Sequence, residues 1–138
     1  MKVRDIVLLV ALASMPATLL AHGEAKHDNK PRAISTEEKA FGREGDPRKV
    51  TRTIDVDMSD KMRFSPGQLT IKQGETVRFR VKNSGQVMLE MVLGTMQELK
   101  EHAEVMKKHP GMEHDEPYMA HVAAGKAETM VWQFTKPG

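Results

Sequence analysis

Methionine and histidine are concentrated in residues 88–121, which contain six methionines and four histidines. Thioether and imidazole groups together are the ligands that a copper site would use, because Met favours the reduced ion Cu(I) and His accepts both oxidation states. The candidate metal ligands in this segment are His102, Met106, His109, Met112, His114, Met119 and His121. Their types predict a segment that contacts copper.

The spacing of these seven residues divides them into two groups. The first three stand at positions i, i+4 and i+7, counted from His102, so a helix would present them on one face. The remaining four form two Met-x-His pairs, beginning at Met112 and at Met119, in a polar and loop-like segment. Near the N-terminus, His22 is a further candidate, because cleavage before it would add its α-amine to its imidazole.

Core packing is the competing interpretation for part of this set. Met96, Leu99, Ala103 and Met106 recur at helical spacing, and such a stripe is more typical of a helix packed on a core than of a metal site. The methionines of the predicted strands are open to the same interpretation. The two Met-x-His pairs lie in a polar loop that has no comparable stripe, so they favour metal contact.

Periodicity divides the rest of the chain into short elements. Five segments have the apolar pattern of β-strands: 54–58, 69–72, 77–81, 87–93 and 130–134. A capping box at Thr95–Glu98 begins a helix, and Pro110-Gly111 ends it. Residues 111–121 are expected to form a loop, and residues 123–126 a turn. Short strands separated by turns predict an all-β sandwich with an inserted helix and a Met/His loop.

The first 49 residues carry the signals of export. Lys2 and Arg4 precede an apolar run that is too short to span a bilayer, which is typical of a cleavable signal peptide over residues 1–21. The alternative, an uncleaved anchor, lacks a stop-transfer flank. Residues 22–49 are polar and interrupted by Gly and Pro, so they predict a mobile arm before a domain at residues 50–138. We expect an exported protein with no membrane association after cleavage.

Composition excludes several classes of function. Removal of the signal peptide takes away two basic residues and one acidic residue, which changes the formal net charge from +2 to +1. A balance so close to zero argues against nucleic-acid binding. The absence of cysteine excludes disulfides, thiolate metal sites and thiol catalysis. No HExxH, GxSxG or P-loop motif is present, so we expect no enzyme.

Eight groups of residues carry a resemblance to a known family. They are Val50-Thr51-Arg52-Thr53-Ile54, Met62-Arg63-Phe64, Gln73-Gly74-Glu75-Thr76-Val77, Asn83-Ser84-Gly85, Glu90-Met91-Val92-Leu93-Gly94-Thr95-Met96, Glu98-Leu99-Lys100-Glu101-His102-Ala103, Met112-Glu113-His114 and Val131-Trp132-Gln133-Phe134-Thr135. Over residues 46–138 the chain resembles the cupredoxins, and more closely their periplasmic branch linked to copper resistance. The resemblance implies a Greek-key β-sandwich of the cupredoxin type in the periplasm, with copper as cofactor. It also implies electron transfer or copper tolerance as function, and a periplasmic redox or copper-handling protein as partner.

Two departures from the cupredoxin pattern concern the blue-copper ligands. The resemblance places the first ligand, a His, at the position of Leu89, and a Cys, a second His and a Met on a C-terminal hairpin beyond Gly138. The final Lys136-Pro137-Gly138 is a turn signal with no element after it, which predicts a fragment or a truncated gene product. A complete domain with a frayed end is the alternative. The chain as given therefore lacks the type 1 ligand set.

Two functions remain as expectations from the sequence. The first is a cupredoxin-like protein of the electron-transfer or copper-tolerance class, whose Met/His segment binds copper more weakly than a blue-copper centre would. The alternative is a metal-free β-sandwich that serves as an interaction module. Leu89 favours the second, and the Met-x-His pairs favour the first.

Overall fold

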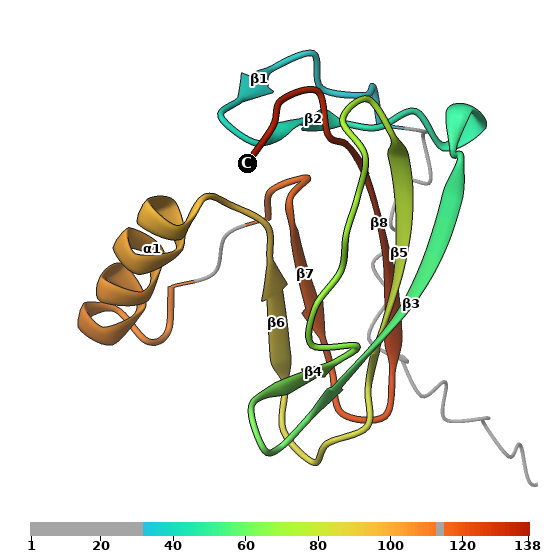
Figure 1. Cartoon of the computed structure of the whole chain (residues 1–138). Coiled ribbons are helices and arrows are strands. Elements are labelled where there is room, and N and C mark those ends of the chain that lie inside the picture. The colour runs from blue at the N-terminus through green and yellow to red at the C-terminus, as the bar shows by residue number, and fades with distance from the viewer. Residues whose placement is uncertain (1–31, 113–114) are drawn as a thin grey trace, which may run out of the picture. The chain divides into compact units, whose positions relative to one another are not determined.

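Two β-sheets face each other across one hydrophobic core in the computed structural model, which describes residues 32–112 and 115–138 (Figure 1). The larger sheet has the strand order β1-β2-β8-β5-β3-β4, and the smaller sheet is the pair β6-β7. The strands are β1 Glu38–Lys39, β2 Gly42–Glu44, β3 Arg52–Ser59, β4 Arg63–Ser65, β5 Thr76–Asn83, β6 Leu89–Val92, β7 Met119–Val122 and β8 Ala127–Gln133. One α-helix, α1, spans Met96–Lys108, and a 3-10 helix spans Pro47–Lys49. The predicted all-β sandwich with an inserted helix is confirmed. The predicted signal peptide lies outside the described residues.

The core follows from the alternation in β5 and in the strands beside it. β3 and β5 run parallel, and β8 pairs antiparallel with β5 on its other side. Val77, Phe79 and Val81 point inward from β5 and are at most 1% exposed. The facing hairpin supplies the other half of the core through Leu89, Met91, Ala120 and Val122. Removal of this apolar area from water stabilises the sandwich by roughly 25 cal/mol per Å².

The segment before residue 50 differs from the predicted mobile arm. Residues 38–44 form the short strands β1 and β2, and β2 pairs with β8. Phe41 stacks on Trp132, and the indole Nε1 of Trp132 donates a hydrogen bond to the carbonyl oxygen of Phe41 at 3.1 Å. The sequence of this segment is polar, but one aromatic ring and the backbone of Gly42 anchor it to the core. The domain therefore begins before residue 50.

The predicted strand at residues 69–72 is wrong. These residues have no regular structure, and the strand that follows β3 is β4, which pairs with it antiparallel. Leu69 is exposed, Ile71 packs against the core, and the carbonyl of Thr70 accepts a hydrogen bond from the guanidinium of Arg52 at 2.9 Å. A side chain, and not a neighbouring strand, therefore satisfies the backbone carbonyl of Thr70.

Helix α1 begins as the sequence predicts. Thr95 accepts a hydrogen bond from the amide of Glu98, and the Glu98 carboxylate accepts one from the amide of Thr95. The predicted core stripe along this helix is wrong, because no residue of α1 is buried and Met96 is 71% exposed. The helix lies outside the two sheets, on the side of the hairpin β6-β7 (Figure 1), and no element of the described residues forms a further layer over it.

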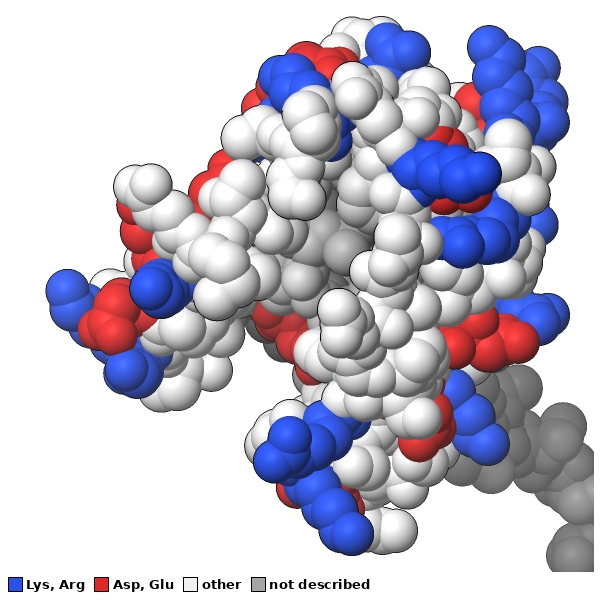
Figure 2. Space-filling model, viewed as in Figure 1, with Lys and Arg blue, Asp and Glu red and all other residues white. Residues whose placement is uncertain are grey.

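Charges on the surface are mixed in sign. On the face shown in Figure 2, basic and acidic side chains are interspersed, in keeping with the near-neutral balance of the sequence. No helix among the described residues is long and apolar enough to cross a membrane.

Candidate metal centre

The outer face of the hairpin β6-β7 carries polar side chains, although its inner face is apolar. Successive residues of a strand point to opposite sides, so Leu89 turns into the core and Glu90 turns away from it. The register pairs Glu90 with His121 and Val92 with Met119. Residues 119–121, which the sequence assigned to a loop, are thus part of a strand that places Met119 and His121 on one side.

Glu90 joins two histidines from different elements. Its Oε1 lies 2.9 Å from Nε2 of His102 on α1, and its Oε2 lies 3.2 Å from Nδ1 of His121 on β7. The three side chains are about a quarter exposed, at 23% for His102, 23% for Glu90 and 29% for His121. One carboxylate therefore orients two imidazoles at the junction of the helix and the hairpin. We call these three residues the Glu90 cluster.

Two methionines adjoin the Glu90 cluster. Met119 is only 8% exposed although it points away from the core, and with His102 and Tyr118 it lines a cavity of about 210 Å³ beside α1. Met106 follows His102 by one helical turn and is half-buried. The junction thus combines imidazole, carboxylate and thioether groups, a donor set that suits copper.

The donor set is not arranged as a finished metal site. Within residues 32–112 and 115–138, no group of three or more His, Cys, Asp or Glu side chains has the geometry to hold a metal ion. Glu90 instead contacts one ring nitrogen of each histidine, which is the position of an outer-shell carboxylate in many metal sites. Entry of a metal would require the imidazoles or the thioethers to turn toward it.

Comparison with known proteins shows the family. The chain is 42% identical over 134 residues to the copper-resistant cuproprotein CopI of Rubrivivax gelatinosus, an alignment that covers 94% of this chain and 81% of that protein. The chain belongs to the CopI family of copper-resistant cuproproteins. It is also 28% identical to CopI of Pseudomonas aeruginosa, with 88% and 82% covered, and 30% identical to CopI of Vibrio cholerae, with 62% and 52% covered.

Other comparisons are more distant. No protein-family model matches the chain. Among solved structures, reduced auracyanin of Roseiflexus castenholzii aligns at 16% identity with a TM-score of 0.46, covering 64% of this chain and 80% of that one. The CopI relatives confirm the predicted resemblance to the copper-resistance branch of the cupredoxins.

Membership of the CopI family directs attention to Leu89, where the cupredoxin resemblance places the first copper ligand. Leu89 is 8% exposed and belongs to the hydrophobic core. Its side chain has no metal-binding atom, and the chain contains no cysteine. The residues present therefore do not fit a type 1 copper centre.

Two further candidates of this CopI-family chain are exposed at and just beyond the end of α1. His109 is the C-terminal cap of α1 and is exposed, and Met112 is 38% exposed just beyond it. His114 lies outside the described residues. The structure thus brings together His102, Met119 and His121, with Met106 on the adjoining turn. Sequence analysis missed Glu90, a lone carboxylate in an apolar strand.

Proposed function

We propose that this protein binds copper in the periplasm and serves copper tolerance. Met106 and Met119 contact the ion together with the Glu90 cluster that lies beside them. It acts as a metal-binding protein and not as an enzyme. Residues 1–21 are its export signal. The observation that supports this proposal most directly is the pair of contacts that Glu90 makes with His102 and His121.

The chemistry of these side chains favours a single ion held in more than one oxidation state. Two thioethers suit Cu(I), two imidazoles suit Cu(I) and Cu(II), and the carboxylate fixes the orientation of both imidazoles. Because these groups come from α1 and from β7, an ion between them would also tie the helix to the hairpin. A helix without buried residues gains more from such a link than a packed one.

Electron transfer through a blue-copper centre has less support than copper tolerance, since Leu89 stands where the first ligand is expected. A metal-free interaction module is the second candidate. It is favoured by the same residue and by the contacts that already occupy Glu90. In that case the Glu90 cluster would serve only to hold α1 against β6-β7.

The test is titration of the purified chain with Cu(I) against a chromophoric competitor. Replacement of Met119 by Leu together with His121 by Gln is expected to weaken binding by about tenfold to a hundredfold or more. The matched control replaces Met112 by Leu and His109 by Gln, the same residue types at exposed positions, and is expected to change affinity much less. With Cu(II), the parent chain should show no intense visible band.

Three results would refute the proposal in different ways. If the two double variants weakened Cu(I) binding equally, the ion would not lie at the Glu90 cluster. Absence of Cu(I) binding in the parent would favour the interaction module. Retention of the tagged full-length chain in the cytoplasm on cell fractionation would refute the periplasmic location.

A further inference from the structure

Three aromatic rings meet on the inner side of the hairpin β6-β7. Phe41 stacks on Trp132 with ring centroids 5.0 Å apart, and Tyr118 meets Trp132 edge-on at 6.1 Å. Tyr118 also meets Phe41 edge-on at 5.7 Å. Trp132 is 1% exposed and Tyr118 is partly exposed. The chain contains one tryptophan and one tyrosine, so its two most easily oxidised aromatic side chains are neighbours.

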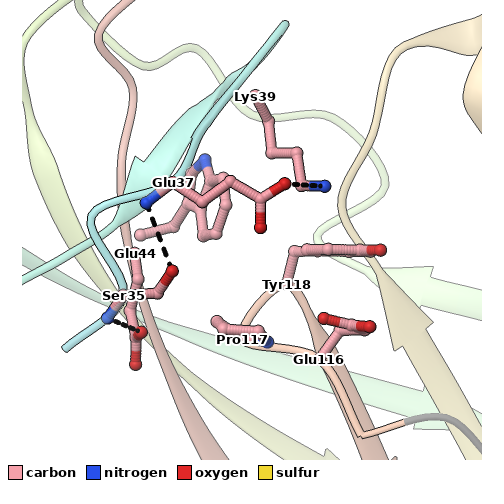
Figure 3. A pocket seen from close by; sticks show the side chains of 8 residues that line it. Ser35, Glu37, Lys39, Glu44, Glu116, Pro117 and Tyr118 are labelled. Atoms are coloured by element: carbon pink, nitrogen blue, oxygen red, sulfur yellow. Dashed lines mark hydrogen bonds and ion pairs between the residues drawn. The ribbon is translucent and has the colours of Figure 1, made fainter. Parts of the chain in front are cut away.

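Tyr118 lies beside the Glu90 cluster and also borders the surface. It precedes Met119 directly, and it lines two cavities with His102, of about 130 Å³ and about 210 Å³. On its other side a hollow opens to the surface, where the ring lies between the side chains of Lys39 and Glu116 (Figure 3). Burial and the Glu116 carboxylate raise the pKa of Tyr118, so its hydroxyl group keeps its proton at neutral pH.

We propose that Trp132 and Tyr118 form a one-electron relay in which an oxidising equivalent that reaches Trp132 ends on Tyr118. Rings in contact exchange an electron readily. A tyrosine that can release its proton forms a neutral radical, which is more stable than the tryptophan radical. Tyr118 is partly exposed and lines an open hollow, so its phenolic proton can leave to water. The indole N–H of Trp132 is held in a hydrogen bond to the carbonyl oxygen of Phe41 and has no such exit.

Peroxide is the oxidant against which the relay would act. Copper bound beside the Glu90 cluster would supply the chemistry that splits peroxide into hydroxide and a hydroxyl radical, with Cu(I) becoming Cu(II). A hydroxyl radical that takes one electron from Trp132 becomes hydroxide. The tryptophan cation radical takes one electron from Tyr118, and the phenolic proton neutralises the hydroxide to water. A thiol or ascorbate then restores the tyrosine by returning an electron and a proton.

The relay spares the thioethers near the Glu90 cluster. Oxidation converts Met into a polar sulfoxide, which removes the soft sulfur that favours Cu(I). A tyrosyl radical at the surface can be repaired by a small reductant, whereas the sulfoxide of a nearly buried Met119 cannot. This protective use rests on the proposed function, but the relay itself needs no metal.

Pulse radiolysis of the metal-free protein tests the relay, because azide radicals oxidise tryptophan in preference to tyrosine. Trp132 is among the residues that line the hollow beside Tyr118, so this small oxidant can approach the edge of its ring. The tryptophan radical is expected to decay as the tyrosyl radical grows, at a rate independent of protein concentration. In Tyr118→Phe, which keeps the ring, the tyrosyl signal is lost and the tryptophan radical persists. Phe134→Leu, which removes a ring outside the contact, leaves the transfer intact.

Two outcomes would overturn the relay. One is a tryptophan radical that decays no faster in the parent than in Tyr118→Phe. The other is a rate of growth of the tyrosyl signal that rises in proportion to protein concentration, which would mean transfer between molecules.

The protective use has its own test. Cu(I)-loaded Tyr118→Phe treated with peroxide should contain more Met119 sulfoxide than the parent, as measured by peptide mass spectrometry. Equal oxidation would refute that use, and failure of copper binding would be seen in the Cu(I) titration.

Discussion

Replacement of Asn83 by Ala should separate the two sheets more than any other change of similar size. Asn83 ends β5 in the larger sheet and is fully buried. Its side-chain amide donates hydrogen bonds to the carbonyls of Val87 at 2.7 Å and of Val122 at 2.8 Å. Its side-chain oxygen accepts one from the amide of Gly85 at 2.9 Å. Val122 lies on β7, so one side chain ties the large sheet to the hairpin that carries the Glu90 cluster.

The expected cost follows from these three bonds. A typical intramolecular hydrogen bond contributes about 1 kcal/mol to stability, so Asn83→Ala should lower the free energy of unfolding by about 3 kcal/mol. That is a large share of the roughly 5–15 kcal/mol that stabilises a domain of this size. Urea unfolding followed by Trp132 fluorescence measures the loss. Gln86→Ala is the control, since its exposed side chain has no such role, and it should stay within about 0.5 kcal/mol of the parent.

Hydrogen exchange decides whether the loss has the stated cause. If Asn83 ties the sheets together, the amides of β6 and β7 should lose protection in Asn83→Ala before those of β3 and β5. A loss below about 1 kcal/mol, equal to that of many surface changes, would refute the reasoning. Uniform loss of protection throughout the sandwich would show that Asn83 contributes to stability without linking the sheets.

Two further predictions test the N-terminal strands and the surface charges. Gly42 has a φ of +121°, and a Cβ there would lie 2.0 Å from the carbonyl oxygen of Gln133, so Gly42→Ala should cost at least about 2 kcal/mol. An unchanged midpoint of thermal unfolding would show that β2 is not needed for the stability of the domain. Hydrogen bonds from Arg80 lower the pKa of Asp55. They therefore stabilise the folded state at pH values above the ordinary carboxyl pKa. This stabilisation is lost as the pH falls through the lowered pKa of Asp55. Asp55→Asn should therefore lower the unfolding midpoint at pH 7 and match the parent in strong acid, and a difference that is constant with pH would contradict this.

Local signals in the sequence predicted the elements that depend on few distant contacts. β3 and β5 alternate apolar and polar residues over long runs, and the capping box of Thr95 and Glu98 marks the start of α1. The strands β1 and β2 could not be predicted in this way. They contain two and three residues, and they form because Phe41 stacks on Trp132, which lies far away in the sequence. Only the folded chain brings that partner near.

The Glu90 cluster shows the same limit for a site. The helical spacing from His102 correctly predicted a shared face for His102 and Met106, but it also included His109, which caps the helix and is exposed. Glu90 was missed because its partners come from a helix and from a neighbouring strand, and their approach depends on register. A single carboxylate within an apolar strand was the available signal, since such a group needs a partner when it leaves water.

Leu89 and Glu90 are adjacent in the sequence and have opposite roles because the strand alternates. Leu89 points between the sheets, where the cupredoxin resemblance expects the blue-copper ligand, and Glu90 points outward to His102 and His121. The replacement of the expected ligand by Leu89 therefore fills the core and leaves the outer face unaltered. The lack of a type 1 ligand at Leu89 is thus compatible with the proposed Met/His copper site, because Glu90, which contacts two of its histidines, lies on the other face of β6. Leu89 therefore does not decide between the two functions that the sequence left open.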